Sequence, residues 1–117
     1  MAASLTIRQE DDITIVDATG RIIMGESATA LQELLRRLTT EGTKKIVLNL
    51  ARVSFMDTAG VGEMVGCYVS ASRTGTKLKI CEVTRRISDL LQMTRLSTVL
   101  DLYDSEADAL QSFRQPR

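Results

Sequence analysis

Alternating hydrophobic and polar residues open the chain and predict two strands. Over residues 4–22, "SLTIRQEDDITIVDATGRI", Leu5 and Ile7 share one face, and Ile13 and Ile15 begin the next apolar set. The polar "QEDD" between them is typical of a hairpin turn. We therefore expect an antiparallel pair of strands at the start of the fold.

A helical period begins at Glu26. Its apolar positions recur at i, i+3, i+4 and i+7, namely at Leu31, Leu34, Leu35 and Leu38. Gly42 follows in the position that glycine favours after a helix. The next apolar run, "KKIVLNL" at residues 44–50, is rich in β-branched residues and predicts a central strand that is covered on both faces.

The rest of the chain alternates helices with strands in the same way. A second helix ends at Gly75, a third is capped by Thr84, and a last one is capped by Ser105. Strands are predicted at "KLKICEV" (77–83) and "STVLDLY" (97–103), and a loose tail is predicted at "RQPR" (114–117). The apolar faces of these three helices are expected at Val61, Met64, Val65 and Tyr68, at Ile87, Leu90, Leu91 and Thr94, and at Ala107, Leu110 and Phe113.

This order of elements predicts the fold class. A hairpin followed by alternating helices and strands favours an α/β fold, with a mixed, mostly parallel sheet of about five strands covered by about four helices. A length of 117 residues suits one compact core. We expect one domain over residues 1–117, with its core at residues 4–113.

Composition and charge exclude several classes of function. Fifteen basic residues balance fifteen acidic ones, so neither nucleic acid nor an anionic membrane is indicated as a partner. Aromatic residues make up 3% of the chain, too few for a platform on which bases stack. Histidine, the commonest general base and metal ligand, is missing from the sequence. We therefore expect no enzyme, no catalytic residue, no cofactor and no metal site.

The cysteines and the apolar runs bear on the compartment. Cys67 and Cys81 match no zinc pattern and are expected to be buried, reduced thiols, with a disulfide between them as the less favoured alternative. The N-terminal residues lack the basic start and apolar core of a signal peptide. No apolar run reaches the ~20 residues that span a bilayer. These features predict a cytoplasmic protein.

The stretch "FMDTAGVGEMVG" at residues 55–66 joins the apolar run "KIVLNLARVSF" to the second helix in an unusual way. Three glycines lie where a helix begins and runs, and each costs about 1 kcal/mol relative to alanine inside a helix. Asp57 and Thr58 stand side by side at the joint, at the carboxyl end of a strand. In α/β folds this end of the sheet carries function.

A helix N-terminus attracts anions, and phosphate above all. A nucleotide loop is a poor match here, because no Lys-Ser or Lys-Thr pair follows the glycines and "GVGEMVG" is one residue too long for a dinucleotide fingerprint. A covalent phosphate on Thr58 is a second hypothesis. The helix dipole would favour it by up to ~1–2 kcal/mol, and Asp57 would oppose it by roughly 1–5 kcal/mol.

The phosphate would therefore act mainly on a partner, by changing the charge of a docking surface. A simpler interpretation makes Asp57 or Thr58 a plain N-cap, and residue types alone favour it. The two interpretations are compatible, because a cap residue lies at the surface. We expect Gly60 and Gly62 to leave room for a partner to reach Thr58, and Gly66 to allow close packing on the sheet.

At this joint the sequence resembles the STAS domain family, and within it the bacterial anti-sigma factor antagonists. The core of the resemblance is a strand, the motif D-[ST]-x-G-x-G and a helix, here "KIVLNLARVSFMDTAGVGEMV". "GTKLKICEVTRRISDLLQMTRLSTVLDLYDSEADAL" extends it, with a leucine-rich helix, a short turn and a strand. The resemblance covers about residues 4–113 of the sequence.

The resemblance implies a domain that binds a partner and catalyses nothing. In such antagonists the residue after the motif aspartate is phosphorylated by the anti-sigma factor, a serine/threonine kinase, and this residue is Thr58 here. The unphosphorylated domain binds the anti-sigma factor and frees its sigma factor, phosphorylation reverses binding, and a phosphatase restores it. Asp57 would shape the acceptor site, and the neighbouring Ala59, Gly60 and Gly62 would shape it or contact the partner.

The sequence departs from the family pattern in two places. The acceptor is threonine rather than the commoner serine, and Ala59 stands where many members have a second serine. Many antagonists also carry an acid soon after the glycine of "GRIIMGES" (20–27), whereas Met24 and Gly25 stand there and Glu26 is the nearest acid. The alternative is a STAS interaction module without a phosphoswitch, such as an accessory subunit of a transporter or of a signalling assembly. The oligomeric state stays open between monomer and weak dimer.

Overall fold

The computed structural model describes residues 3–114 of the chain. Its elements follow the predicted order of a hairpin and then alternating helices and strands. Their bounds are β1 (Ser4–Glu10), β2 (Ile13–Ile22), α1 (Glu26–Thr40), β3 (Lys45–Met56), α2 (Thr58–Arg73), β4 (Lys77–Cys81), α3 (Arg85–Met93), the 3-10 turn η1 (Leu96–Thr98), β5 (Leu102–Tyr103) and α4 (Glu106–Arg114).

The five strands form one sheet in the order β1-β2-β3-β4-β5. β1 and β2 are the predicted antiparallel pair, and β2 to β5 run parallel to one another. β3 is central, as predicted, and its 12 residues include the apolar run 45–55, "KIVLNLARVSF", which the sequence predicts to be a buried strand leading to the joint. The predicted α/β class and the mixed, mostly parallel sheet are confirmed.

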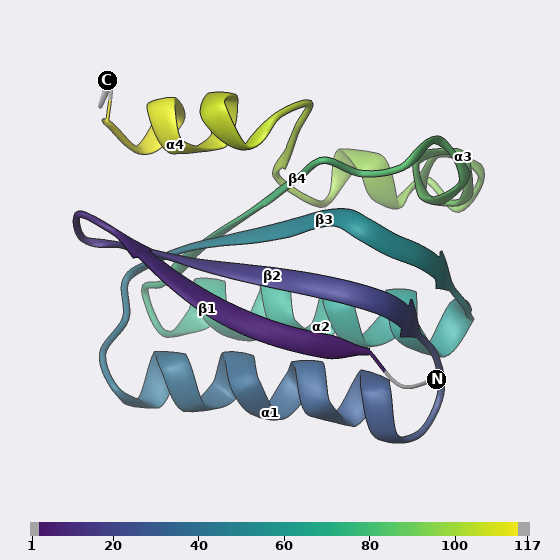
Figure 1. Cartoon of the computed structure of the whole chain (residues 1–117), viewed down its shortest axis with the longest axis horizontal. Coiled ribbons are helices and arrows are strands. Elements are labelled where there is room, and N and C mark those ends of the chain that lie inside the picture. Colours follow the sequence, from purple (N-terminus) through teal and green to yellow (C-terminus); the bar gives the residue numbers. More distant parts are fainter. Residues whose placement is uncertain (1–2, 115–117) are drawn as a thin grey trace.

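Helices cover both faces of the sheet. In Figure 1, α1 and α2 lie side by side below the sheet, and α4 lies above it. The main core lies between the sheet, α1, α2 and α3, where Leu31, Leu48, Met64 and Leu91 are fully buried. A smaller cluster fills the space under α4: Ile13, Ile15, Val47, Cys81, Ala109 and Leu110.

The predicted helical faces and ends are largely confirmed. In α1, Leu31, Leu35 and Leu38 are buried and Leu34 is half-buried. Gly42 follows with a φ of +93°, a left-handed conformation that glycine adopts without a steric penalty. The Thr84 hydroxyl caps α3 by accepting from the N–H of Ile87, as predicted.

Three predictions near the C-terminus were wrong. Only Leu102–Tyr103 of the expected strand 97–103 pairs with β4, because residues 96–98 form a 3-10 turn and Leu100 turns into the core. Ala107 is exposed, because the face of α4 that meets the sheet carries Ala109 instead. Arg114 is the last residue of α4 rather than part of a loose tail, and it forms ion pairs with the β1–β2 hairpin. The remaining tail residues 115–117 lie outside the described part of the chain.

Polar side chains fasten α4 to the sheet. At its first residue, the Glu106 carboxylate accepts hydrogen bonds from Arg8 and from Asn49, the latter at 2.8 Å. Further along, the buried Lys79 of β4 donates to the Ser112 hydroxyl at 2.7 Å and to the Tyr103 hydroxyl at 3.1 Å. These contacts supplement an apolar cluster that is much smaller than the main core.

The attachment of α4 should weaken in acid. The hydrogen bond from Arg8, helped by that from Asn49, outweighs desolvation and lowers the pKa of Glu106 below its ordinary value of 4.5. A lowered folded-state pKa stabilises the protein above the unfolded pKa, and this stabilisation is lost as the pH falls through the folded-state pKa. We expect Glu106→Gln to lower the free energy of unfolding by about 1 kcal/mol at pH 7, since its partner Arg8 is half exposed.

Urea unfolding of the two proteins between pH 7 and pH 3 measures this difference. It should shrink toward zero in acid, because the wild-type carboxyl is then protonated as well. Asp89→Asn serves as the control, since Asp89 is exposed and forms no ion pair within residues 3–114. A difference that stays constant over this pH range would contradict the assignment to Glu106.

Candidate functional site

The joint between β3 and α2 is built on one aspartate. β3 ends at Met56 and α2 begins at Thr58, so Asp57 stands between them in an extended conformation. Its Oδ1 accepts a hydrogen bond from the N–H of Gly60 at 2.8 Å. This is the N-cap arrangement, which satisfies one of the free N–H groups of the first turn. The structure thus makes Asp57, and not Thr58, the cap.

The same carboxylate reaches a second segment. Its Oδ2 accepts from the N–H of Met24 at 2.9 Å, and the N–H of Asp57 donates to the Ile22 carbonyl at 3.4 Å. Asp57 therefore ties the start of α2 to the loop that joins β2 to α1. The two segments lie at the same end of the sheet in Figure 1, at the right.

The two amide hydrogen bonds also stabilise the negative charge of Asp57. The hydrogen bond from the Met24 N–H has the largest effect and that from the Gly60 N–H the next largest. Together they lower the pKa of the Asp57 carboxyl below its ordinary value of 3.8. Asp57 is therefore ionised at neutral pH. A fixed negative charge stands next to Thr58 in the sequence and next to the Met24 loop in space.

Thr58 itself is exposed, as the first residue of α2. Within residues 3–114 its hydroxyl has no hydrogen-bond partner, so no hydrogen bond of the described fold depends on it. Ala59 beside it is half-buried. The acceptor predicted from the sequence is thus at the surface, where another protein can reach it.

The glycines have roles different from those expected. Gly60 is buried, and a Cβ there would lie 2.9 Å from the Ile22 carbonyl carbon and closer still to its oxygen. Gly60 therefore allows α2 to approach β2. Gly66 is exposed, with nothing within 4 Å of an added Cβ, so the prediction that it packs closely on the sheet was wrong. Gly62 is also exposed and open, as expected.

The other candidates from the sequence are mostly part of the fold. Met56 and Met64 are buried in the main core, and Tyr68 packs against it. Arg85 and Arg86 are exposed at the start of α3. Cys67 and Cys81 are buried and free, as expected, and burial raises the pKa of each thiol to about 12.

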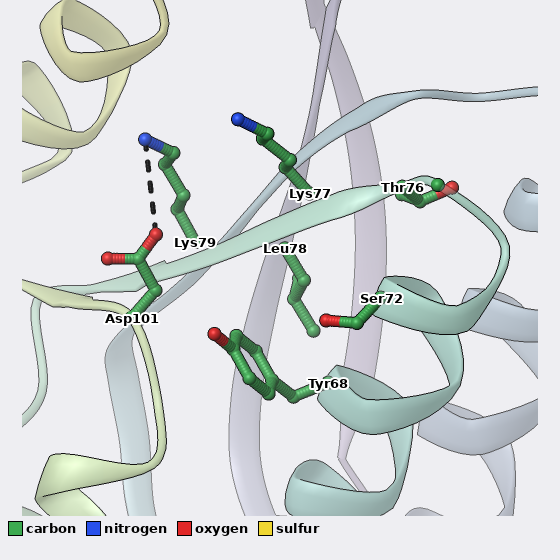
Figure 2. Close-up of a pocket in the computed structure, with 8 residues that line it drawn as sticks. Tyr68, Ser72, Thr76, Lys77, Leu78, Lys79 and Asp101 are labelled. Atoms are coloured by element: carbon green, nitrogen blue, oxygen red, sulfur yellow. Dashed lines mark ion pairs between the residues drawn. The ribbon is translucent and has the colours of Figure 1, made fainter.

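Five hollows in residues 3–114 are lined by residues other than Asp57 and Thr58. Figure 2 shows a hollow of about 350 Å³ beside β4, where Tyr68 and Ser72 of α2 face it and the Lys79 Nζ lies 3.9 Å from a carboxylate oxygen of Asp101. Within residues 3–114, no three Cys, Asp or Glu side chains are placed to hold a metal ion.

The sequence marked Met24 and Gly25 as a departure from the family pattern, but it did not indicate that this loop contacts Asp57. Residues 24 and 57 are far apart in sequence, and their contact runs through a backbone N–H, which every residue but proline offers. No local pattern indicates such a contact.

As to the membrane, no helix within residues 3–114 is long and apolar enough to cross one.

Comparison with known proteins completes this description. The family model described as "STAS domain" matches residues 4–109. The anti-sigma F factor antagonist of Paenibacillus polymyxa is 26% identical over 110 residues, which are 94% of each chain. The anti-sigma-B factor antagonist of Staphylococcus aureus is 34% identical over 70 residues, 60% of this chain and 65% of that protein. The crystal structure of an anti-sigma factor antagonist from Mycobacterium paratuberculosis superposes with a TM-score of 0.87 at 20% identity, covering 97% of this chain and 96% of the other.

Proposed function

Because the chain belongs to the STAS domain family, we propose that it is an anti-sigma factor antagonist that is switched at Thr58. The two curated relatives carry this name, and one of them matches nearly the whole chain. Since one fold serves many functions, the proposal also needs support from the site itself.

The observation that carries the proposal is the exposure of Thr58 beside an ionised Asp57. Thr58 is exposed, so a kinase can reach it, and its hydroxyl forms no hydrogen bond within residues 3–114. Asp57 is engaged by two backbone amides and is thereby positioned. We propose that Asp57 shapes the acceptor site, that Gly60 sets its backbone by packing on β2, and that Ala59 and the open Gly62 face the partner.

The switch would work through charge. In the unphosphorylated form the Asp57 carboxylate stands beside Thr58, and the domain binds the anti-sigma factor, which releases its sigma factor. A phosphate adds about −1.5 to −2 charges at this point. The phosphate on Thr58 and the Asp57 carboxylate then both face a partner surface that complements the carboxylate alone. The affinity therefore falls, and the anti-sigma factor is free again. In this scheme the anti-sigma factor is itself the serine/threonine kinase, and a phosphatase reverses the modification.

Phosphoryl transfer tests this proposal directly. The protein is incubated with ATP and a candidate anti-sigma factor kinase, and phosphate is located by mass spectrometry. We expect one phosphate on Thr58, absent in Thr58→Ala and retained in Thr29→Ala, which removes another exposed threonine. Transfer to a different residue, or no transfer by a kinase that nevertheless binds the protein, would rule out the switch. The second of these outcomes, binding without transfer, would indicate a STAS interaction module without a phosphoswitch.

A further inference from the structure

Met24 is a large apolar side chain that the fold leaves exposed. It is 76% exposed on the loop between β2 and α1. A single exposed apolar residue is ordinary on a protein surface. Met24 differs from such a residue in where it stands and in how firmly its backbone is held.

Hydrogen bonds to two side chains, those of Asp57 and Ser27, hold the backbone around Met24. The N–H of Met24 donates to Asp57 Oδ2 at 2.9 Å. One residue earlier, the N–H of Ile23 donates to the buried Ser27 hydroxyl at 2.8 Å, and that hydroxyl donates back to the Ile23 carbonyl at 3.0 Å. One residue later, Gly25 has a φ of +102°, a conformation that side-chain-bearing residues rarely adopt. The loop is therefore ordered without a partner, so little conformational entropy is lost when one binds.

Met24 also adjoins the phosphoacceptor. A single carboxylate, that of Asp57, joins the Met24 N–H to the first turn of α2, and Thr58 is the residue that follows Asp57. A protein that covers both Thr58 and the Asp57 carboxylate therefore comes close to the backbone of Met24. The methionine side chain is flexible and polarisable, and it fits an apolar pocket with little demand on exact shape.

We propose that Met24 contributes to partner binding by inserting into an apolar pocket of the anti-sigma factor when that protein covers Thr58. This inference rests on the proposed function and names a contact within the same surface. Asp57 acts as a positioning residue in it, because its carboxylate holds the Met24 backbone. The pocket on the partner has to be apolar, because the Met24 side chain would remove water from a charged group there and offer no hydrogen bond or opposite charge in return.

Affinity measurements on substituted proteins test this contact. The anti-sigma factor that binds the wild-type chain is titrated with Met24→Ala, Met24→Leu and Met24→Glu by isothermal calorimetry. We expect the dissociation constant to rise at least about tenfold for Met24→Ala and further for Met24→Glu, and to stay within about threefold for Met24→Leu. Because Met24 is exposed, the substitutions should leave the thermal unfolding temperature nearly unchanged.

Met93→Ala is the matched control. Met93, at the end of α3, is 82% exposed, more than any other methionine within residues 3–114, and its backbone does not hydrogen-bond to Asp57. We expect this variant to bind within about twofold of wild type. If wild type binds and Met24→Ala binds equally well, the inference on Met24 fails and the proposed function stands. If the wild-type chain binds no anti-sigma factor, the proposed function fails and the inference with it.

Discussion

Thr58→Glu is expected to weaken binding to the anti-sigma factor by about 100-fold or more. A second carboxylate beside the ionised Asp57 places two like charges on a surface whose complement accommodates one, and such a mismatch costs several kcal/mol when the partner excludes water. The substitution should not harm the fold, because an acidic residue in the first turn of a helix interacts favourably with its dipole. Surface plasmon resonance measures the affinity, and thermal unfolding checks the stability.

Thr58→Gln is the control that separates charge from size. Glutamine has the shape of glutamate without its charge, so we expect a loss of only a few fold. The difference between the two variants should decrease as salt is raised from low to high concentration, because screening weakens exposed charges. Equal losses for both would mean that the surface rejects bulk rather than charge, and equal retention would mean that no charge switch operates at Thr58.

Gly60→Ala is expected to destabilise the fold by about 3 kcal/mol or more. The added Cβ would overlap the Ile22 carbonyl, which is backbone at the end of β2 and cannot rotate away. Overpacking of this kind costs typically 1–3 kcal/mol and more where the neighbour is rigid. A shift of α2 away from β2 would also disturb the hydrogen bond between Gly60 and Asp57. Urea unfolding measures the loss.

Gly62→Ala and Gly66→Ala are the matched controls on the same helix. An added Cβ meets no atom within 4 Å at either position, so alanine should stabilise the protein by about 0.5–1 kcal/mol through its helix propensity. If Gly60→Ala proved as stable as these two variants, the inference that α2 approaches β2 too closely for a side chain at residue 60 would be wrong. If Gly62→Ala gains stability and weakens partner binding, the cost of that glycine is explained by docking rather than by the fold.

The fold was predictable because its pattern repeats over many residues. The leucines of α1 recur with a helical period and the run of β3 is continuously apolar, so a single residue cannot obscure either pattern. The structure has a helix at Glu26–Thr40 and a strand at Lys45–Met56. The expected strand 97–103 failed for the opposite reason. Its residues have strand propensity, but a strand forms only where residues lie beside another strand. Only Leu102 and Tyr103 lie beside β4, because the turn after α3 carries the preceding residues elsewhere.

In the candidate site, too, some features were predictable from the sequence and others were not. The sequence by itself determined that an acid and a hydroxyl stand at a strand–helix joint with glycines after them, because these are statements about residue order. Only the tertiary structure decided that Asp57 is the cap, that Gly60 rather than Gly66 is the packing glycine, and that Met24 belongs to this surface. Each of these depends on which backbone groups of β2 and its loop come close to α2. Backbone N–H and C=O groups are nearly the same at every residue, so their pairing leaves no mark on the sequence, and only the packed chain determines it.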